Sequence, residues 1–240
     1  MPRVKTARLP GGGTLDWVEW PDDPRHVLAF ENAFVRIYSA RFDAGQACET
    51  MFHRHAEDTL YACITSEGPG GAVLNTEALL DPATQLPVGV GPPQRVSFAP
   101  GLCFCHLNRS GPNRIHRIQT EAGNKGTLEF IGAEVLARPP AAATAPLAHP
   151  AYRQEPVSHP RARAYRLSLP PGAAGTGPVE WGFSGVAVVL AGAPSAPALA
   201  AAAGGALRRG AAFWFDGPLT VDVGNGGGGE AAELLVFEWT

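Results

Sequence analysis

The feature that most constrains this chain is a series of short strand-like segments about ten residues apart, the rhythm of a β-sandwich or small barrel. In AFVRIYSARF (33–42), apolar and polar residues alternate, as in a strand with one buried face. TLYACIT (59–65) and TLEFIGAEVL (127–136) continue the series, and turns rich in Gly and Pro separate its members. The sequence therefore predicts an all-β protein.

The second half of the chain repeats the layout of the first. The matched segments are 164–172 with 37–45, 180–192 with 53–65, the run from Gly210 with the run from Gly101, LTVDV with RIHRI, and 234–239 with 130–135. A ladder of matched segments is much harder to obtain by chance than any single motif. We therefore expect a duplicated fold of two β-barrels.

The expected boundaries follow from composition. Residues 1–136 comprise an irregular N-terminal segment (1–28) and the first barrel, and residues 164–240 form the second. Between them, 137–163 is rich in Ala and Pro and is interpreted as an extended linker or a strap over the surface. His149 and His159 stand beside prolines in this linker, so we expect both to be exposed.

Charge and cysteine content exclude several classes of function. The formal net charge is −3 and basic residues form no block, which argues against nucleic acid or an anionic membrane as partner. No stretch of 18 apolar residues and no signal-peptide pattern is present. The four cysteines are irregularly spaced in a chain too long to need disulfides. We expect a soluble protein of the reducing cytoplasm, either a monomer or a homodimer.

Histidines are concentrated in one segment, FHRHAEDTLYAC (52–63). His53 and His55 are two residues apart on an expected strand, so their side chains leave the same face. His116 lies on another expected strand, RIHRI. Three neutral imidazoles that converge inside a barrel suit Fe, Zn, Cu, Ni or Co better than Mg or Ca.

These motifs resemble those of the cupin superfamily, whose barrels carry an H-x-H pair on one strand and a single His several strands later. FHRHAEDTLYACITSEG, with Gly45 before it, is similar to the first cupin motif, and Gly101 to His116, with Pro112 before the His, is similar to the second. The resemblance covers residues 30–136 and 164–240. It implies a bicupin, with two double-stranded β-helix (jelly-roll) barrels and one metal site at His53, His55 and His116.

The chain departs from the family at the position of a metal-binding glutamate. Many cupins place it four residues after the second His of the pair, where this chain has Thr59. Either a shifted turn brings Glu57 or Asp58 to the metal, or the site has three histidines, as in cysteine-dioxygenase-like cupins.

His106 is a further candidate, because a symmetric hairpin would place it opposite His116. It could be the third metal ligand, a fourth ligand, or a group that orients another imidazole. The repeat favours His116 as the third ligand, since it aligns with Thr220 in the strand that follows Gly-Pro in both halves.

The second half has lost the corresponding histidines. Glu180 and Gly182 stand in place of His53 and His55, Thr220 replaces His116, and no histidine follows His159. Without ligands the second barrel cannot hold the ion, so we expect it to have a structural role, covering a sheet of the first or supplying a partner surface.

The resemblance implies an Fe(II)-dependent dioxygenase that acts on a small metal-chelating organic molecule, with Zn, Ni, Mn, Co or Cu as other candidate ions. Tyr61, Cys63 and Phe104 are expected to line its pocket. Cupins have many functions, so the alternative is a non-catalytic module that binds a small ligand or a metal.

Overall fold

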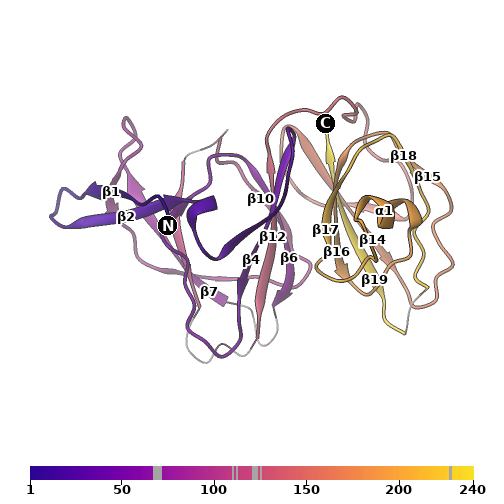
Figure 1. Ribbon diagram of the computed structural model, residues 1–240, viewed down its shortest axis with the longest axis horizontal. Coiled ribbons are helices and arrows are strands. Elements are labelled where there is room, and N and C mark those ends of the chain that lie inside the picture. The colour runs from indigo at the N-terminus through magenta and orange to yellow at the C-terminus, as the bar shows by residue number, and fades with distance from the viewer. Residues whose placement is uncertain (67–71, 110, 112, 121–123, 125, 227–228) are drawn as a thin grey trace.

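The computed structural model of the protein describes residues 1–240 except 67–71, 110, 112, 121–123, 125 and 227–228. Pro112 and the Glu-Gly end of the first cupin-like motif therefore lie outside the described residues. The described elements are almost all strands, and they form two groups that lie side by side (Figure 1).

Twelve strands belong to the N-terminal group. They are β1 (Lys5–Arg8), β2 (Thr14–Glu19), β3 (His26–Glu31), β4 (Val35–Phe42), β5 (His53–Arg54), β6 (Thr59–Ser66), β7 (Ala72–Leu80), β8 (Pro87–Val90), β9 (Gln94–Ser97), β10 (Cys103–His106), β11 (Ile115–Gln119) and β12 (Leu128–Val135), with the 3-10 helix η1 (Trp20–Asp22) between β2 and β3. One sheet has the order β10-β6-β12-β4-β3. The other has the order β1-β2-β5-β11-β7-β8, and β9 also pairs with β7.

The C-terminal group is smaller. It contains β13 (Tyr152–Gln154), β14 (Ala162–Leu169), β15 (Val179–Trp181), β16 (Gly185–Ala191), the short helix α1 (Pro197–Ala202), β17 (Ala212–Phe215), β18 (Leu219–Val221) and β19 (Ala232–Trp239). Its five-stranded sheet has the order β17-β16-β19-β14-β13, which is the order β10-β6-β12-β4-β3 of the first half, strand for strand. The two-stranded sheet β15-β18 takes the place of the pair β5-β11. The repeat that the sequence predicts is thus present in the strand order.

The two five-stranded sheets pack against each other through an apolar core that both halves share (Figure 1). Ile37, Leu60 and Val135 contribute from the first half, and Val188 and Phe237 from the second. Each of these side chains is essentially fully buried. Sheets stacked face to face bury apolar side chains from both inner faces. The second half therefore covers a sheet of the first half, which is one of the two structural roles expected for it from the sequence.

The expectation that residues 1–28 are irregular is wrong, because β1 and β2 form an antiparallel pair and β3 begins at His26. The segment 137–163, expected as an extended linker or a strap over the surface, contains β13 and places Ala143 in the apolar core of the second half. The pattern along the sequence missed these strands because β1 and β13 are short and depend on pairing with β2 and β14.

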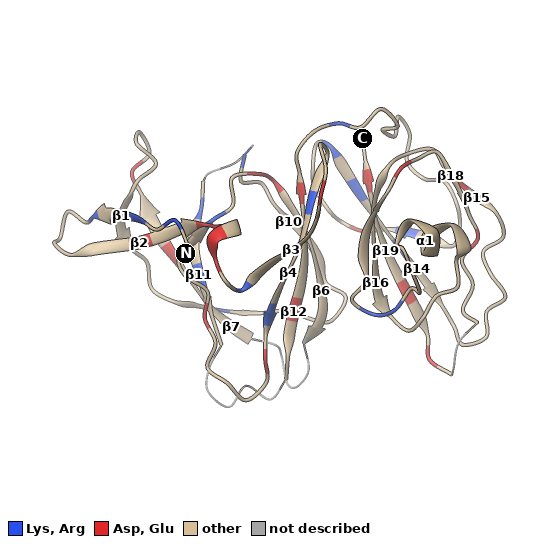
Figure 2. Cartoon of the chain, in the orientation of Figure 1, with Lys and Arg blue, Asp and Glu red and all other residues tan. Residues whose placement is uncertain are grey.

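Charged residues are spread over both halves, with acidic and basic side chains intermixed (Figure 2). Ion pairs join several of them, for example Arg54 with Glu19 and Arg166 with Glu155. In the described part of the chain, no helix has the length and apolar character needed to cross a membrane.

Candidate metal centre

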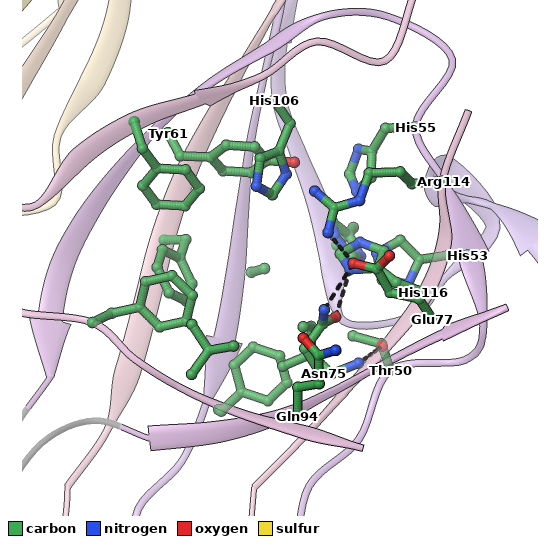
Figure 3. Close-up of a pocket in the computed structure, with 18 of the residues that line it drawn as sticks. Thr50, His53, His55, Tyr61, Asn75, Glu77, Gln94, His106, Arg114 and His116 are labelled. Atoms are coloured by element: carbon green, nitrogen blue, oxygen red, sulfur yellow. Dashed lines mark hydrogen bonds and ion pairs between the residues drawn. The ribbon is translucent and has the colours of Figure 1, made fainter. Parts of the chain in front are cut away.

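A cavity of about 360 Å³ opens in the first half, with walls supplied by both of its sheets (Figure 3). Its lining divides into a cluster of imidazoles, an aromatic wall and a few polar groups. These residues include His26, His53, His55, His106, His116, Tyr38, Tyr61, Phe98, Phe104, Phe130, Asn75, Glu77, Gln94 and Arg114. Apolar walls with a few convergent polar groups are typical of small-molecule sites.

The three histidines expected as ligands come together on one side of this cavity (Figure 3). His53 is on β5 and His55 follows directly after that strand, while the antiparallel pairing of β11 with β5 sets His116 directly opposite His53. The ring centroids are 4.5 Å apart for His53 and His116, 5.0 Å for His53 and His55, and 5.8 Å for His55 and His116.

A fourth histidine, His26 at the start of β3, belongs to the same cluster and was not singled out from the sequence. One ring nitrogen from each of His26, His53 and His55 lies within 4.8 Å of the others, a spacing that suits metal binding. His116 is outside this tightest group of nitrogens, although its ring contacts that of His53. The only signal for His26 in the sequence is its position three residues after Asp23, which is too weak to identify a ligand.

The Nδ1 atom of each of these four rings faces a hydrogen-bond acceptor. The pairs are His26 with Asp23 Oδ1 at 3.3 Å, His53 with the Met51 carbonyl oxygen at 2.9 Å, His55 with Tyr38 Oη at 3.2 Å, and His116 with Asn75 Oδ1 at 3.0 Å. A carbonyl, a carboxylate and an amide oxygen can only accept, so His26, His53 and His116 must donate from Nδ1.

The same reasoning extends to His55 through a chain of hydroxyl groups. Tyr38 donates its hydroxyl proton to Tyr61 Oη at 3.0 Å, so its oxygen accepts from Nδ1 of His55. A neutral imidazole with its proton on Nδ1 carries its lone pair on Nε2. Within the described residues, no protein group hydrogen-bonds to these Nε2 atoms. All four lone pairs are therefore available to an ion, which is the arrangement that metal-binding histidines usually show.

Burial favours the neutral form of the three expected ligands. Desolvation lowers the pKa of His53 to about 3, and electrostatic repulsion from the nearby His26 ring adds to the effect. Desolvation likewise lowers the pKa of His55 and of His116 well below 6.5, and the neighbouring imidazoles add to the effect. Metal binding requires the neutral form of His, so no deprotonation is needed at neutral pH.

Glu57 and Asp58, the alternatives for the missing carboxylate, have partners away from the cavity, and neither they nor Thr59 are among its lining residues. Glu57 pairs with Arg109 at 3.1 Å, and the Thr59 hydroxyl donates to the Glu57 carbonyl oxygen. Asp58 accepts a hydrogen bond from the Arg109 backbone N–H and lies 3.3 Å from His159. The expectation that His159 is exposed is wrong, because its side chain is fully buried against Asp58.

His106 also lines the cavity, beside Tyr61 and apart from the His53 and His116 pair (Figure 3). The symmetric hairpin considered for it does not form, because β10 pairs with β6 and β11 pairs with β5 and β7. Its ring centroid is 5.3 Å from that of Tyr61. Burial and the positive charge of Arg114 lower the pKa of His106 to about 4.

The remaining lining gives the cavity two kinds of surface. Tyr61, Phe104, Phe98 and Phe130 form an aromatic wall, in which the Tyr61 and Phe104 rings stack at 4.9 Å. Cys63 is fully buried in a neighbouring apolar cluster and is not among the residues that line the cavity.

The polar surface centres on an ion pair between Arg114 and Glu77 (Figure 3). Asn75 also donates to Glu77, at 3.1 Å. Asn75 therefore joins this ion pair to the imidazole cluster, because the same side chain accepts from His116.

In the second half, the counterparts named from the sequence face the wrong way. Glu180 pairs with Thr220 in register, as His53 pairs with His116, but Glu180 and Thr220 are exposed and bonded to each other. The inward positions hold Trp181 and Phe183, which both belong to the apolar core inside the second half. Adjacent residues of a strand point to opposite faces, so the alignment read from the sequence is one residue out of phase with the inward face of β15. The interior of the second half next to these positions is occupied by the rings of Trp181 and Phe183.

Comparisons with known proteins agree with this architecture. No family model matches the chain, and no curated protein matches it in sequence. Among solved structures it is similar to quercetin 2,3-dioxygenase from Acinetobacter baumannii, with a TM-score of 0.53, 13% identity, and coverage of 99% of this chain and 77% of that one.

Two further structures are similar over comparable lengths. A salicylate 1,2-dioxygenase variant from Pseudoaminobacter salicylatoxidans, in complex with gentisate, has a TM-score of 0.51 and 12% identity over 89% of this chain and 73% of that one. An oxalate decarboxylase variant from Bacillus subtilis has a TM-score of 0.50 and 13% identity over 98% of this chain and 75% of that one. At such identities the likeness shows a common fold.

Proposed function

From the cupin fold of this chain, we propose that the protein is a metal-dependent oxygenase, with Fe(II) as the metal, that acts on a small metal-chelating organic molecule. His53, His55 and His116 are the proposed metal ligands. The observation that carries the proposal is the cluster of buried neutral imidazoles beside a cavity, whose unprotonated nitrogens bond to no other described residue. Imidazole donors without a carboxylate suit Fe, Zn, Cu, Ni or Co, and the donor set therefore fits such an ion.

The metal ion would supply Lewis-acid and redox chemistry at a point where a chelating substrate and dioxygen can meet. The chain's own contribution is orientation. Met51, Tyr38 and Asn75 hold the three ligand rings in one tautomer, so the donor atoms are in place before any ion arrives. Preorganised ligands lose little freedom on binding, and such supporting hydrogen bonds typically change metal affinity by about 10-fold to 100-fold.

The shape of the cavity supports a substrate with a flat apolar body and an acidic group. Tyr61, Phe104 and Phe130 offer aromatic faces, which favour stacking or edge contacts with a ring. Arg114 lies across from this wall and pairs with Glu77, where its guanidinium can also reach a carboxylate or phenolate. The names of two of the similar structures, a quercetin and a salicylate dioxygenase, support the same class of substrate.

Oxygen consumption tests the proposal directly. Metal-free protein is loaded with Fe(II) under anaerobic conditions, and oxygen uptake is then followed with catechol-like compounds, β-diketones and thiols. The proposal predicts uptake with stoichiometric product from at least one compound, lost in His53→Ala. A protein that binds Fe(II) at the cluster but consumes no oxygen across the panel contradicts it and favours the non-catalytic binding module.

Arg114 provides a second arm of this test. Arg114→Gln is expected to raise the KM for acidic substrates by about 10-fold or more, since a charged hydrogen bond contributes about 1.5 to 3 kcal/mol. Arg109→Gln is the matched control, because Arg109 pairs with Glu57 away from the cavity. Equal KM values for the two variants would remove Arg114 from substrate binding.

A further inference from the structure

The starting point is the turn that leads into β3, which brings a carboxylate and an imidazole to the edge of the proposed metal site. The Asp23 carboxylate is fully buried, and its Oδ2 accepts a hydrogen bond from the Met51 backbone N–H at 2.6 Å. This bond ties the turn to the segment that immediately precedes β5. Oδ1 of the same carboxylate lies 3.3 Å from Nδ1 of His26.

His26 is held firmly in this position. Its side chain is only 5% exposed, and its ring lies 4.6 Å from that of His53 and 5.4 Å from that of His55. Trp20 and Tyr38 contact the same ring, with centroids at 5.8 and 5.3 Å. The ring therefore has packing partners on several sides, and one of its nitrogens shares the close-spaced group with nitrogens of His53 and His55.

The donor chemistry of His26 matches that of the other three rings. Since Nδ1 points at a carboxylate, the proton resides there and Nε2 carries the lone pair. A carboxylate behind a histidine makes the ring a stronger donor and fixes its orientation, the arrangement found behind many metal ligands. The family's glutamate position is meanwhile occupied by Thr59, and Glu57 and Asp58 are engaged elsewhere.

We infer that His26 is a fourth metal ligand, supplied by β3 from outside the two cupin-like motifs and positioned by Asp23. This inference rests on the proposed function, because it requires that an ion binds at His53, His55 and His116. The site then has four imidazole donors, and the negative charge of Asp23 acts on the ion through the His26 ring instead of through direct ligation. Such a donor set selects Fe, Co, Ni, Cu or Zn over Mg and Ca.

Cobalt(II) is a suitable probe, because its visible spectrum reports the number and type of ligands and its binding does not depend on turnover. Metal-free wild-type protein and the variants His26→Ala, His26→Gln and Asp23→Asn are titrated with Co(II), and the Kd and d–d spectrum are recorded. His149→Gln is the matched control, since His149 lies in the 137–163 segment and contacts Tyr152. Circular dichroism confirms that each variant is folded.

The inference predicts that both His26 variants raise the Kd for Co(II) by at least about 10-fold and change the spectrum, and that Asp23→Asn raises the Kd by a smaller factor with the ligand count unchanged. X-ray absorption should count four imidazoles in the wild type and three in His26→Gln. The control should match the wild type in every readout.

Two results overturn the inference, and they are distinguishable. If folded His26→Gln keeps the wild-type Kd and spectrum while His53→Ala loses the ion, His26 is not a ligand and the proposed function stands. If wild-type protein binds no Co(II) at the cluster, the proposed function and the inference fail together.

Discussion

Gly132 on β12 lies directly beneath the ring of Tyr38 on β4, at a point where even a methyl group would collide with the ring. Tyr38 is fully buried, and its hydroxyl is the acceptor that fixes the His55 tautomer. A glycine inside a strand often marks the close approach of another group. The position of the proposed ligand His55 thus depends on a glycine on β12, a strand that contributes no ligand itself.

Gly132→Ala is therefore expected to displace Tyr38 and to disturb His55. Overpacking of a core typically costs about 1 to 3 kcal/mol, so the free energy of unfolding should fall by that amount and the affinity for Co(II) should fall with it. Denaturant unfolding and metal titration measure the two effects. Gly182→Ala is the control, because an added Cβ at that position meets no atom within 4 Å. Equal effects of the two substitutions would refute the role given to Gly132.

A buried pair between the halves should contribute to stability without affecting the metal site. The His159 and Asp58 side chains are both buried and lie 3.3 Å apart. His159→Ala leaves the buried carboxylate without this partner, and the free energy of unfolding should fall by about 1 to 3 kcal/mol. Metal affinity should be unchanged in His159→Ala and in Asp58→Asn, because this pair is not among the residues that line the cavity. A weaker metal Kd in Asp58→Asn would instead support the shifted carboxylate considered from the sequence.

His106 should make the metal-free protein sensitive to acid. Burial and the nearby Arg114 lower the pKa of His106 from 6.5 to about 4, so the unfolded chain binds this proton more readily than the folded one. The contribution of neutral His106 to the free energy of unfolding is complete above about pH 6.5. It is lost as the pH falls towards 4, by up to about 1.4 kcal/mol per pH unit. The free energy of unfolding, measured from pH 7 to 4, should fall less steeply in His106→Gln. If the free energy of unfolding falls equally steeply with pH in the wild type and in His106→Gln, His106 is not the source of the acid sensitivity.

Metal binding should stabilise the folded protein. An ion that binds only the folded state adds about 2.7 kcal/mol at a concentration 100 times its Kd. Zn(II) should raise the thermal midpoint of wild-type protein, a chelator should reverse the shift, and His53→Ala should abolish it. Thr220→Ala should keep the full shift, because Thr220 is exposed in the second half. A shift that persists in His53→Ala would place the bound ion elsewhere.

The sequence alone determined the features that depend on local pattern. Alternation and turn composition predicted the strands around Ile37, Tyr61 and Phe130, and the matched segments predicted a second half with the same strand order. The alignment of His116 with Thr220 does not hold, because Thr220 is exposed and His116 is buried. The His53 and His55 pair, in contrast, follows from the two-residue period of a strand. Such patterns repeat along the chain, so they can be recognised without coordinates.

Only the tertiary structure decided the rest of the candidate site. His26 reaches the cluster because Asp23 bonds to Met51, and these residues are 28 positions apart. The partners of the Nδ1 atoms come from separate segments: Tyr38 from β4, Asn75 from β7, Met51 from just before β5 and Asp23 from the turn before β3. In the second half, the positions aligned by sequence with His53 and His116 face outward, and Trp181 faces inward. Contacts of this kind depend on how turns and sheets bring distant residues together, and a local sequence pattern carries no record of them.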